Sequence, residues 1–301
     1  METAVVPSLD SRVDDFLRAP AAAAMFVLAD HNGLDADRLA EPTTAATVAG
    51  TALNDLNPWT GDAAAQRAEV LDAVGSLRAL VAAVVTDPRN AWWSAPLRRD
   101  AQLLLTGADE PRQDLMDLPT PTGPLGEWEA YAQKPFPVVV TSTELPVPPT
   151  AKIRSGAHAE LACGCSDWAP TYPVRQARLH VAPTARVQEI DSAADWHHLA
   201  LRYGDPGTHP GPDRQLIETA GIDNGLAPTW SAVAADLDGV HLTFAGLLTA
   251  LYVPVTTGDI TTTLWAWEWE CTRWLRSAFT TVTPLPDLAE PPHPGSLTVR
   301  R

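Results

Sequence analysis

Apolar residues in the first third of the chain recur at the three- and four-residue spacing of α-helices. The clearest such segment is 62–86, in which valines and leucines repeat at this spacing behind Asp62 as a candidate N-cap. Asp87-Pro88 ends it. Further helices are predicted over residues 8–17, 21–34 and 97–105. These patterns predict a helical domain over residues 1–110.

Beyond residue 126 the pattern changes to that of β-strands joined by short helices. β-branched or alternating runs predict strands over residues 137–143, 176–181, 185–190, 239–243 and 250–256. Helices are predicted over 192–204 and 230–236. The segment 261–275 alternates throughout, which is typical of one long strand with two distinct faces. The fold class is therefore α+β: a helical N-terminal part followed by a mixed β-sheet domain with short helices.

Two segments rich in proline divide this arrangement further. Residues 111–126 combine Pro, Gly and Asp and indicate a linker or a long surface loop. The segment 286–301 is a Pro-rich tail. The α+β part is thus expected to span residues 127–285 and to be the catalytic domain.

Charge and cysteine content narrow the partners and the compartment. The 301-residue chain has a formal net charge of -16, which disfavours nucleic acid and anionic membranes as partners. It has no signal peptide pattern and no apolar stretch long enough to span a membrane. Three cysteines do not build a disulfide framework, so a cytoplasmic protein is expected. Metal-ligand spacings such as H-E-x-x-H are missing, so no metal is expected.

The residues with the most chemical content are Glu268 and Glu270, in the sequence Trp-Glu-Trp-Glu-Cys. On a continuous strand the two carboxylates share one face, and three tryptophans take the other. Such a pair suits the stabilisation of a developing cation or the activation of a hydroxyl nucleophile. The alternative is a half-exposed strand with solvated glutamates.

The order of two motifs resembles the ADP-ribosyltransferase fold over roughly residues 127–279. In that family a Ser-Thr-Ser strand end supports the nicotinamide pocket, and a Glu on a later strand binds the nicotinamide ribose. Here Thr141, Ser142 and Thr143 end a predicted strand, and Glu268-Trp269-Glu270 follows later. The triplet is Thr-Ser-Thr rather than Ser-Thr-Ser. The resemblance implies NAD as a substrate, and Glu270 as the residue that stabilises the cationic ribose.

Other roles implied by the resemblance are less defined. Glu268 would activate the acceptor, which is an unknown small molecule or protein, or water. The family also needs an Arg or His that holds the NAD phosphates or the adenosine ribose, and Arg99 is the candidate. His241, in the predicted strand 239–243, is a candidate base or ring-stacking contact, although a lone strand histidine is more often structural. The Ala-, Asp- and Arg-rich composition is compatible with a bacterial source.

Two other classes of function stay open. The eleven tryptophans could supply aromatic surfaces in a non-catalytic binding or regulatory protein, with the acidic charge favouring a basic partner. A transferase or hydrolase that does not use NAD is the third possibility. P-loop, dinucleotide-binding and nucleophile-elbow signatures are absent from the sequence.

Overall fold

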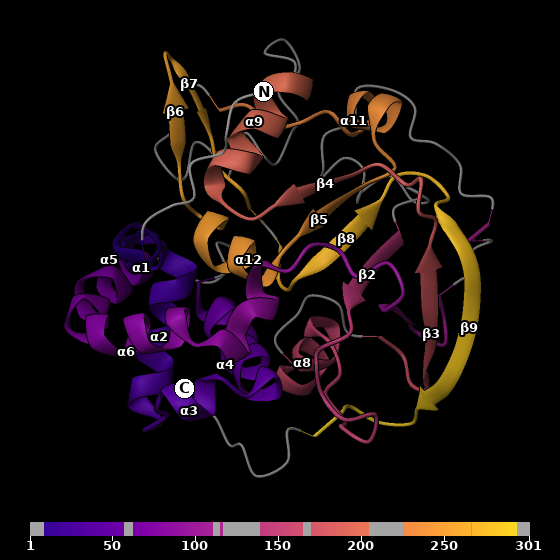
Figure 1. Ribbon diagram of the computed structural model, residues 1–301, viewed down its shortest axis with the longest axis horizontal. Helices are drawn as coiled ribbons and strands as arrows, with labels where there is room; N and C mark the ends of the chain where they lie inside the picture. Colours follow the sequence, from indigo (N-terminus) through magenta and orange to yellow (C-terminus); the bar gives the residue numbers. More distant parts are fainter. Residues whose placement is uncertain are drawn as a thin grey trace.

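The computed structural model describes residues 9–56, 63–110, 115–116, 139–164, 170–204, 225–265 and 267–293. The chain is α+β, as the sequence predicts: helices come first, and a seven-stranded mixed sheet follows (Figure 1). Within the described residues, no helix is both long enough and apolar enough to cross a membrane.

The N-terminal part is a cluster of helices that ends in a 3-10 turn. Its elements are α1 (Leu9–Arg18), α2 (Pro20–His31), α3 (Ala36–Leu39), α4 (Pro42–Asp55), α5 (Ala63–Val74), η1 (Gly75–Leu77), α6 (Arg78–Thr86) and η2 (Pro88–Ser94). Proline begins α2, α4 and η2, where its missing N–H costs nothing. The predicted helix over 62–86 is confirmed as α5 and α6, with the single turn η1 between them.

The sheet has the order β4-β5-β8-β2-β1-β3-β9, in which only β4 and β5 are parallel. Its strands are β1 (Gln102–Thr106), β2 (Val139–Thr143), β3 (Val174–Val181), β4 (Val187–Ile190), β5 (Gly239–Leu242), β8 (Cys271–Trp274) and β9 (Phe279–Leu288). Pro284 and Pro286 lie in β9, an edge strand, where a proline breaks no interior ladder.

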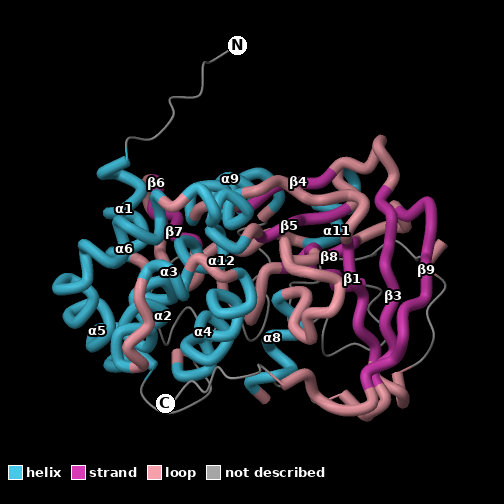
Figure 2. Tube along the Cα trace, turned by 60° about the horizontal axis from the view of Figure 1, so that its bottom comes forward, coloured by secondary structure: helices cyan, strands magenta, loops and turns pink. Residues whose placement is uncertain are grey.

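The remaining elements connect and cover these strands. They are α8 (Gly156–Cys163), α9 (Ala193–Tyr203), α11 (Trp230–Asp236), α12 (Phe244–Ala250), and the hairpin of β6 (Val255–Thr257) and β7 (Ile260–Thr262). Helix α12 packs against α2, and α8 packs against α4 (Figure 2). Helix α12 also packs against η2. These contacts join the helical part to the sheet.

The largest hydrophobic core cluster draws residues from both parts of the chain, from Val13 in α1 to Leu275 after β8. Trp93 of η2 shows how they meet: its ring lies 5.9 Å from that of Phe16 in α1 and 5.1 Å from that of Phe244 in α12. The predicted linker, residues 111–126, lies outside the described residues apart from Leu115 and Met116.

Four sequence-based element predictions are wrong. Residues 102–106 form strand β1 rather than part of a helix over 97–105. The strand predicted over 250–256 is wrong for most of its length, because Ala250 ends helix α12 and strand β6 covers only Val255–Thr257. The Pro-rich tail begins inside β9, which continues to Leu288. The long strand over 261–275 does not exist, because β7 ends at Thr262 and β8 begins at Cys271.

Candidate functional site

Glu270 lies directly before β8, an interior strand of the sheet. This strand lies between β2 and β5, so the Glu270 side chain meets the end of β2. Ser142 Oγ donates to Glu270 Oε2 at 2.8 Å, and the Thr143 amide N–H donates to both carboxylate oxygens at 3.0 and 3.1 Å. The carboxylate is buried, with only 8% of the side chain exposed. These donors fix its position and compensate for the lost hydration.

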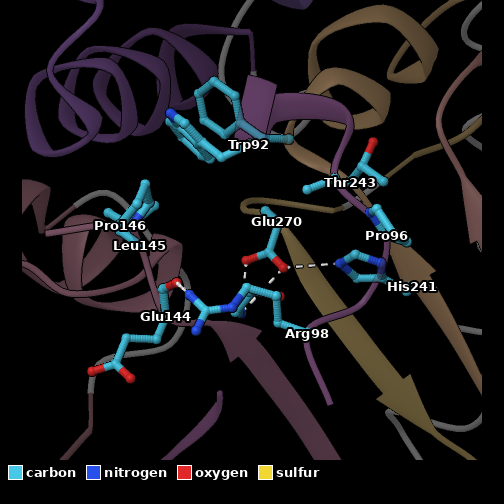
Figure 3. A pocket seen from close by; sticks show the side chains of 12 residues that line it. Trp92, Pro96, Arg98, Glu144, Leu145, Pro146, His241, Thr243 and Glu270 are labelled. Carbon is cyan, nitrogen blue, oxygen red and sulfur yellow. Dashed lines mark hydrogen bonds and ion pairs between the residues drawn. The ribbon is translucent and has the colours of Figure 1, made fainter. Parts of the chain in front are cut away.

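His241 lies beside Glu270 on strand β5. Its Nε2 is 3.0 Å from Glu270 Oε1 (Figure 3). Its Nδ1 forms a close contact with Glu189 Oε2 on the neighbouring strand β4. Burial alone would lower the pKa of His241, but hydrogen bonds and attraction from Glu189 and Glu270 outweigh it and raise this pKa to about 9. At neutral pH the imidazole is therefore positively charged.

The strand register places Glu189 beside His241, and Glu270 lies two residues before the residue of β8 that pairs with His241. Glu189 pairs with His241 across β4 and β5, and His241 pairs with Thr272 across β5 and β8. Side chains at paired positions lie on the same face, so residues far apart in sequence come within hydrogen-bonding distance. We call Glu189, His241 and Glu270 the triad.

A pocket of about 80 Å³ opens above Glu270 and His241. Three segments complete its wall (Figure 3). They are Trp92, Ala95, Pro96 and Arg98 from η2 and the residues after it, residues 143–146 from the end of β2 onward, and residues 243–244 at the start of α12. The rings of Trp92 and Phe244 in this wall are 4.8 Å apart, and Arg98 supplies a cationic group. The pocket thus combines an aromatic wall, a fixed carboxylate and a guanidinium.

Gln102 of β1 organises the polar groups beneath the pocket. Its Oε1 accepts from the hydroxyls of Thr141 at 2.6 Å and Thr272 at 3.2 Å, and its Nε2 donates to Thr143 Oγ1 at 3.0 Å. Thr141 Oγ1 also accepts from Trp274 Nε1 at 2.8 Å. A network in which each buried donor has a partner holds the end of β2 in one arrangement.

Charged groups also flank the pocket at Glu144. Its carboxylate pairs with Arg154 and, at 2.9 Å, with Arg178. Burial opposes the charge of Glu144, but the two guanidinium groups outweigh it and lower the pKa of this carboxyl. Glu144 is therefore held in place by its own partners.

Asp191 lies behind the pocket wall at the end of β4. Thr243, which lines the pocket, donates its hydroxyl to Asp191 Oδ1 at 2.6 Å and accepts from the amide of Gly246 at 2.9 Å. Burial raises the pKa of Asp191 above its usual value. Thr243 is thus fixed as the N-cap of α12.

The structure brings together four of the site residues chosen from the sequence. Ser142, Thr143, His241 and Glu270 contact one another. Thr141 lies just beneath them, with its hydroxyl turned to Gln102 and Trp274.

Glu268 and Arg99 lie elsewhere. Glu268 is absent from the pocket wall. Burial raises the pKa of Tyr252, and the charge of Glu268 adds to this rise. The expected face shared by Glu268 and Glu270 is wrong, because no strand runs through both residues. Arg99 donates to the carbonyl oxygens of Ala182 and Ala185 at 2.6 and 2.9 Å, so its guanidinium holds the turn between β3 and β4.

Several residues of the site were missed by the sequence analysis. They are Trp92, Arg98, Gln102, Glu144 and Glu189. Only Glu189 carried a usable signal: a strand–helix–strand passage favours parallel neighbouring strands, which would place it near His241. The described residues contain no group of three or more His, Cys, Asp or Glu side chains arranged to hold a metal.

Comparisons of the chain with models of protein families, with curated proteins and with solved structures found no match. Any function for this site is therefore inferred from the geometry and chemistry of its own residues.

Proposed function

We propose that this protein is an enzyme that cleaves the bond between nicotinamide and ribose in NAD and transfers ADP-ribose to an acceptor or to water. The observation that carries the proposal is the contact between the Thr-Ser-Thr strand end and Glu270. Ser142 and Thr143 hold this carboxylate at the pocket by three hydrogen bonds of 2.8 to 3.1 Å. The resemblance to ADP-ribosyltransferases implies that a strand-end hydroxyl triplet and a later glutamate serve one pocket, and this contact supports that expectation.

The charge of Glu270 suits the chemistry of this bond. Breaking a glycosidic bond produces an oxocarbenium-like transition state with positive charge on the ribose. An anion that is already fixed and partly desolvated stabilises such a charge without having to reorganise. Ser142, Thr143 and His241 keep the Glu270 carboxylate in one place for this purpose.

The pocket wall suits a planar leaving group. The rings of Trp92 and Phe244 offer surfaces on which nicotinamide can stack, and Arg98 offers a guanidinium for a phosphate. The volume of about 80 Å³ is smaller than the roughly 150 Å³ of an engineered cavity that holds benzene. Entry of the ring therefore requires a wall residue to move, and the half-buried Trp92 is the candidate.

Roles for the remaining candidates follow from their positions. Glu268 and Arg99 are absent from the pocket wall, so neither is assigned to the acceptor or to the phosphates.

The alternative of a non-catalytic binding protein with exposed tryptophans has less support. In the described part of the chain the exposed large apolar side chains are Met116, Leu201 and Val282.

The test is release of nicotinamide from NAD by the purified full-length protein, compared with Glu270→Gln and with Glu41→Gln as a matched control. Glu41 lies at the N-terminus of α4, is absent from the pocket wall, and has a carboxylate that accepts from Arg38 and Thr44. The proposal expects release by the wild type and by Glu41→Gln, and loss of at least about a hundredfold in Glu270→Gln. If the wild type releases no nicotinamide and NAD does not raise its melting temperature, the proposal is refuted and the binding protein is favoured.

A further inference from the structure

In the part of the chain that the structure describes, three buried histidines each bridge two side chains, and their partners differ in kind. His158 bridges a serine hydroxyl and a glutamine oxygen, and His197 bridges two threonine hydroxyls, all at 2.9 Å. A neutral imidazole has one N–H and one lone pair, and a hydroxyl can satisfy either. His241 instead bridges two carboxylates, Glu189 and Glu270, and an ionised carboxylate can accept hydrogen bonds but cannot donate one.

Two ionised carboxylates can both be satisfied only by an imidazole with two N–H groups. A neutral ring would turn its lone pair toward one carboxylate and would leave two negative charges facing each other across it. The geometry therefore requires a positive charge on His241 whenever both glutamates are ionised.

We propose that His241 and Glu189 are positioning residues for Glu270: His241, as an imidazolium, ties down the Glu270 carboxylate, and Glu189 keeps that ring charged. Neither residue needs to touch the reacting bond. Their part in catalysis rests on the proposed cleavage of NAD, whereas the charge of His241 does not.

The surroundings of His241 support this assignment. The charged groups that face its ring are Glu189 from β4 and Glu270 from the start of β8, and its other neighbour on β8, Thr272, is uncharged. The other charged residues of the pocket wall are Arg98 and Glu144. The raised pKa of His241, about 9, agrees with a ring that lies between two anions.

Glu189 is suited to a second task. Its side chain is 35% exposed, so it joins the buried triad to the protein surface. Its Oε1 accepts from the amide of Leu97 at 3.1 Å. Leu97 lies between Pro96 and Arg98, which both line the pocket, so Glu189 fixes this wall and His241 together.

The first experiment is an ¹⁵N NMR titration of the imidazole groups in the full-length wild type, in Glu189→Gln and in Glu41→Gln. Glutamine keeps the shape of Glu189 and an oxygen for the Leu97 amide. In the wild type, His241 should carry two N–H groups at neutral pH and should titrate near pH 9. In Glu189→Gln its pKa should fall by about 1 to 3 pH units, and Glu41→Gln should match the wild type.

The other histidines serve as references in the same spectra. Burial lowers the pKa of His158 to about 4 and also lowers that of His197, so both should be neutral at pH 7. Unchanged signals from both show that Glu189→Gln keeps the fold. A neutral His241 in the wild type, or an unchanged titration in Glu189→Gln, overturns the proposal.

The second experiment measures nicotinamide release against pH in the same three proteins. The alkaline limb of kcat/KM should fall near pH 9 in the wild type and should move to lower pH in Glu189→Gln by the change seen in the NMR titration. An alkaline limb that stays in place while the titration moves refutes the positioning role. Absence of release by the wild type refutes the proposed function alone, because the NMR titration needs no substrate.

Discussion

Replacing His241 with glutamine should make the stability of this protein less dependent on pH in the neutral to alkaline range. In the wild type, the folded state binds a proton at His241 more tightly than the unfolded state does, because Glu189 and Glu270 flank the ring. The resulting stabilisation is complete below the unfolded pKa of about 6.5 and is lost as the pH rises through the folded pKa of about 9. Glutamine has no charge to lose in this range.

The size of the effect follows from the two pKa values. Each pH unit between them corresponds to about 1.4 kcal/mol at 25 °C. The rise in the pKa of His241 from 6.5 to about 9 therefore corresponds to about 3 kcal/mol of stability. The group is almost fully buried, with 2% of its side chain exposed, so solvent screening reduces this figure little.

The assay is urea unfolding of the wild type and of His241→Gln at about pH 6 and about pH 10, on either side of the two pKa values. Titration of the groups that do not contact His241 is common to both proteins and cancels in the comparison. The wild type should lose about 3 kcal/mol more than the variant between the two conditions. An equal loss in both proteins would show that His241 is not charged in the folded state, and the argument for the triad would fail.

Two further predictions concern packing. Gly246→Ala should destabilise the protein by about 3 kcal/mol or more, because the new Cβ would lie 2.0 Å from the carbonyl oxygen of Ile190. The control Gly75→Ala, whose new Cβ would meet nothing within 4 Å, should change stability by less than about 1 kcal/mol. Equal urea midpoints for the two variants would contradict this prediction. Trp93→Ala should lower the free energy of unfolding by about 3 to 5 kcal/mol, because the Trp93 ring is only 2% exposed and packs the helical part against α12. Leu201→Ala, at an exposed position, should lower it by about 0.5 kcal/mol. Similar losses for the two variants in calorimetry would contradict this prediction.

The parts of the fold that could be predicted from sequence are those that local chemistry determines. The β-branched run that ends at Thr143 forms β2, and the segment that Ser192 caps forms α9. In both, neighbouring residues alone favour the observed conformation. The contact between Ser142 and Glu270 required more, namely that β8 pairs beside β2, whereas the sequence indicated only that the glutamate follows the triplet along the chain.

The failed prediction over 261–275 shows where local pattern misleads. Alternation there came from tryptophans spaced two apart, and a strand was the simplest structure that would give them one face. In the fold, Trp267 packs on Trp196 with ring centroids 6.3 Å apart and on the guanidinium of Arg273 at 4.4 Å. These tertiary contacts bury the segment without a ladder of backbone hydrogen bonds, so Glu268 and Glu270 do not share a strand face.

The helical part of the chain contributes directly to the candidate site. Trp92 and Arg98 in the pocket wall come from the first 110 residues, and the Leu97 amide between them donates to Glu189 of the triad. A shift of this segment would therefore move the pocket wall and a partner of His241 at once. Because His241 in turn holds Glu270, only the side chains of Glu189 and His241 lie between the Leu97 amide and the Glu270 carboxylate. Substitutions in the helical part that loosen this packing act on the same group as substitutions in the sheet.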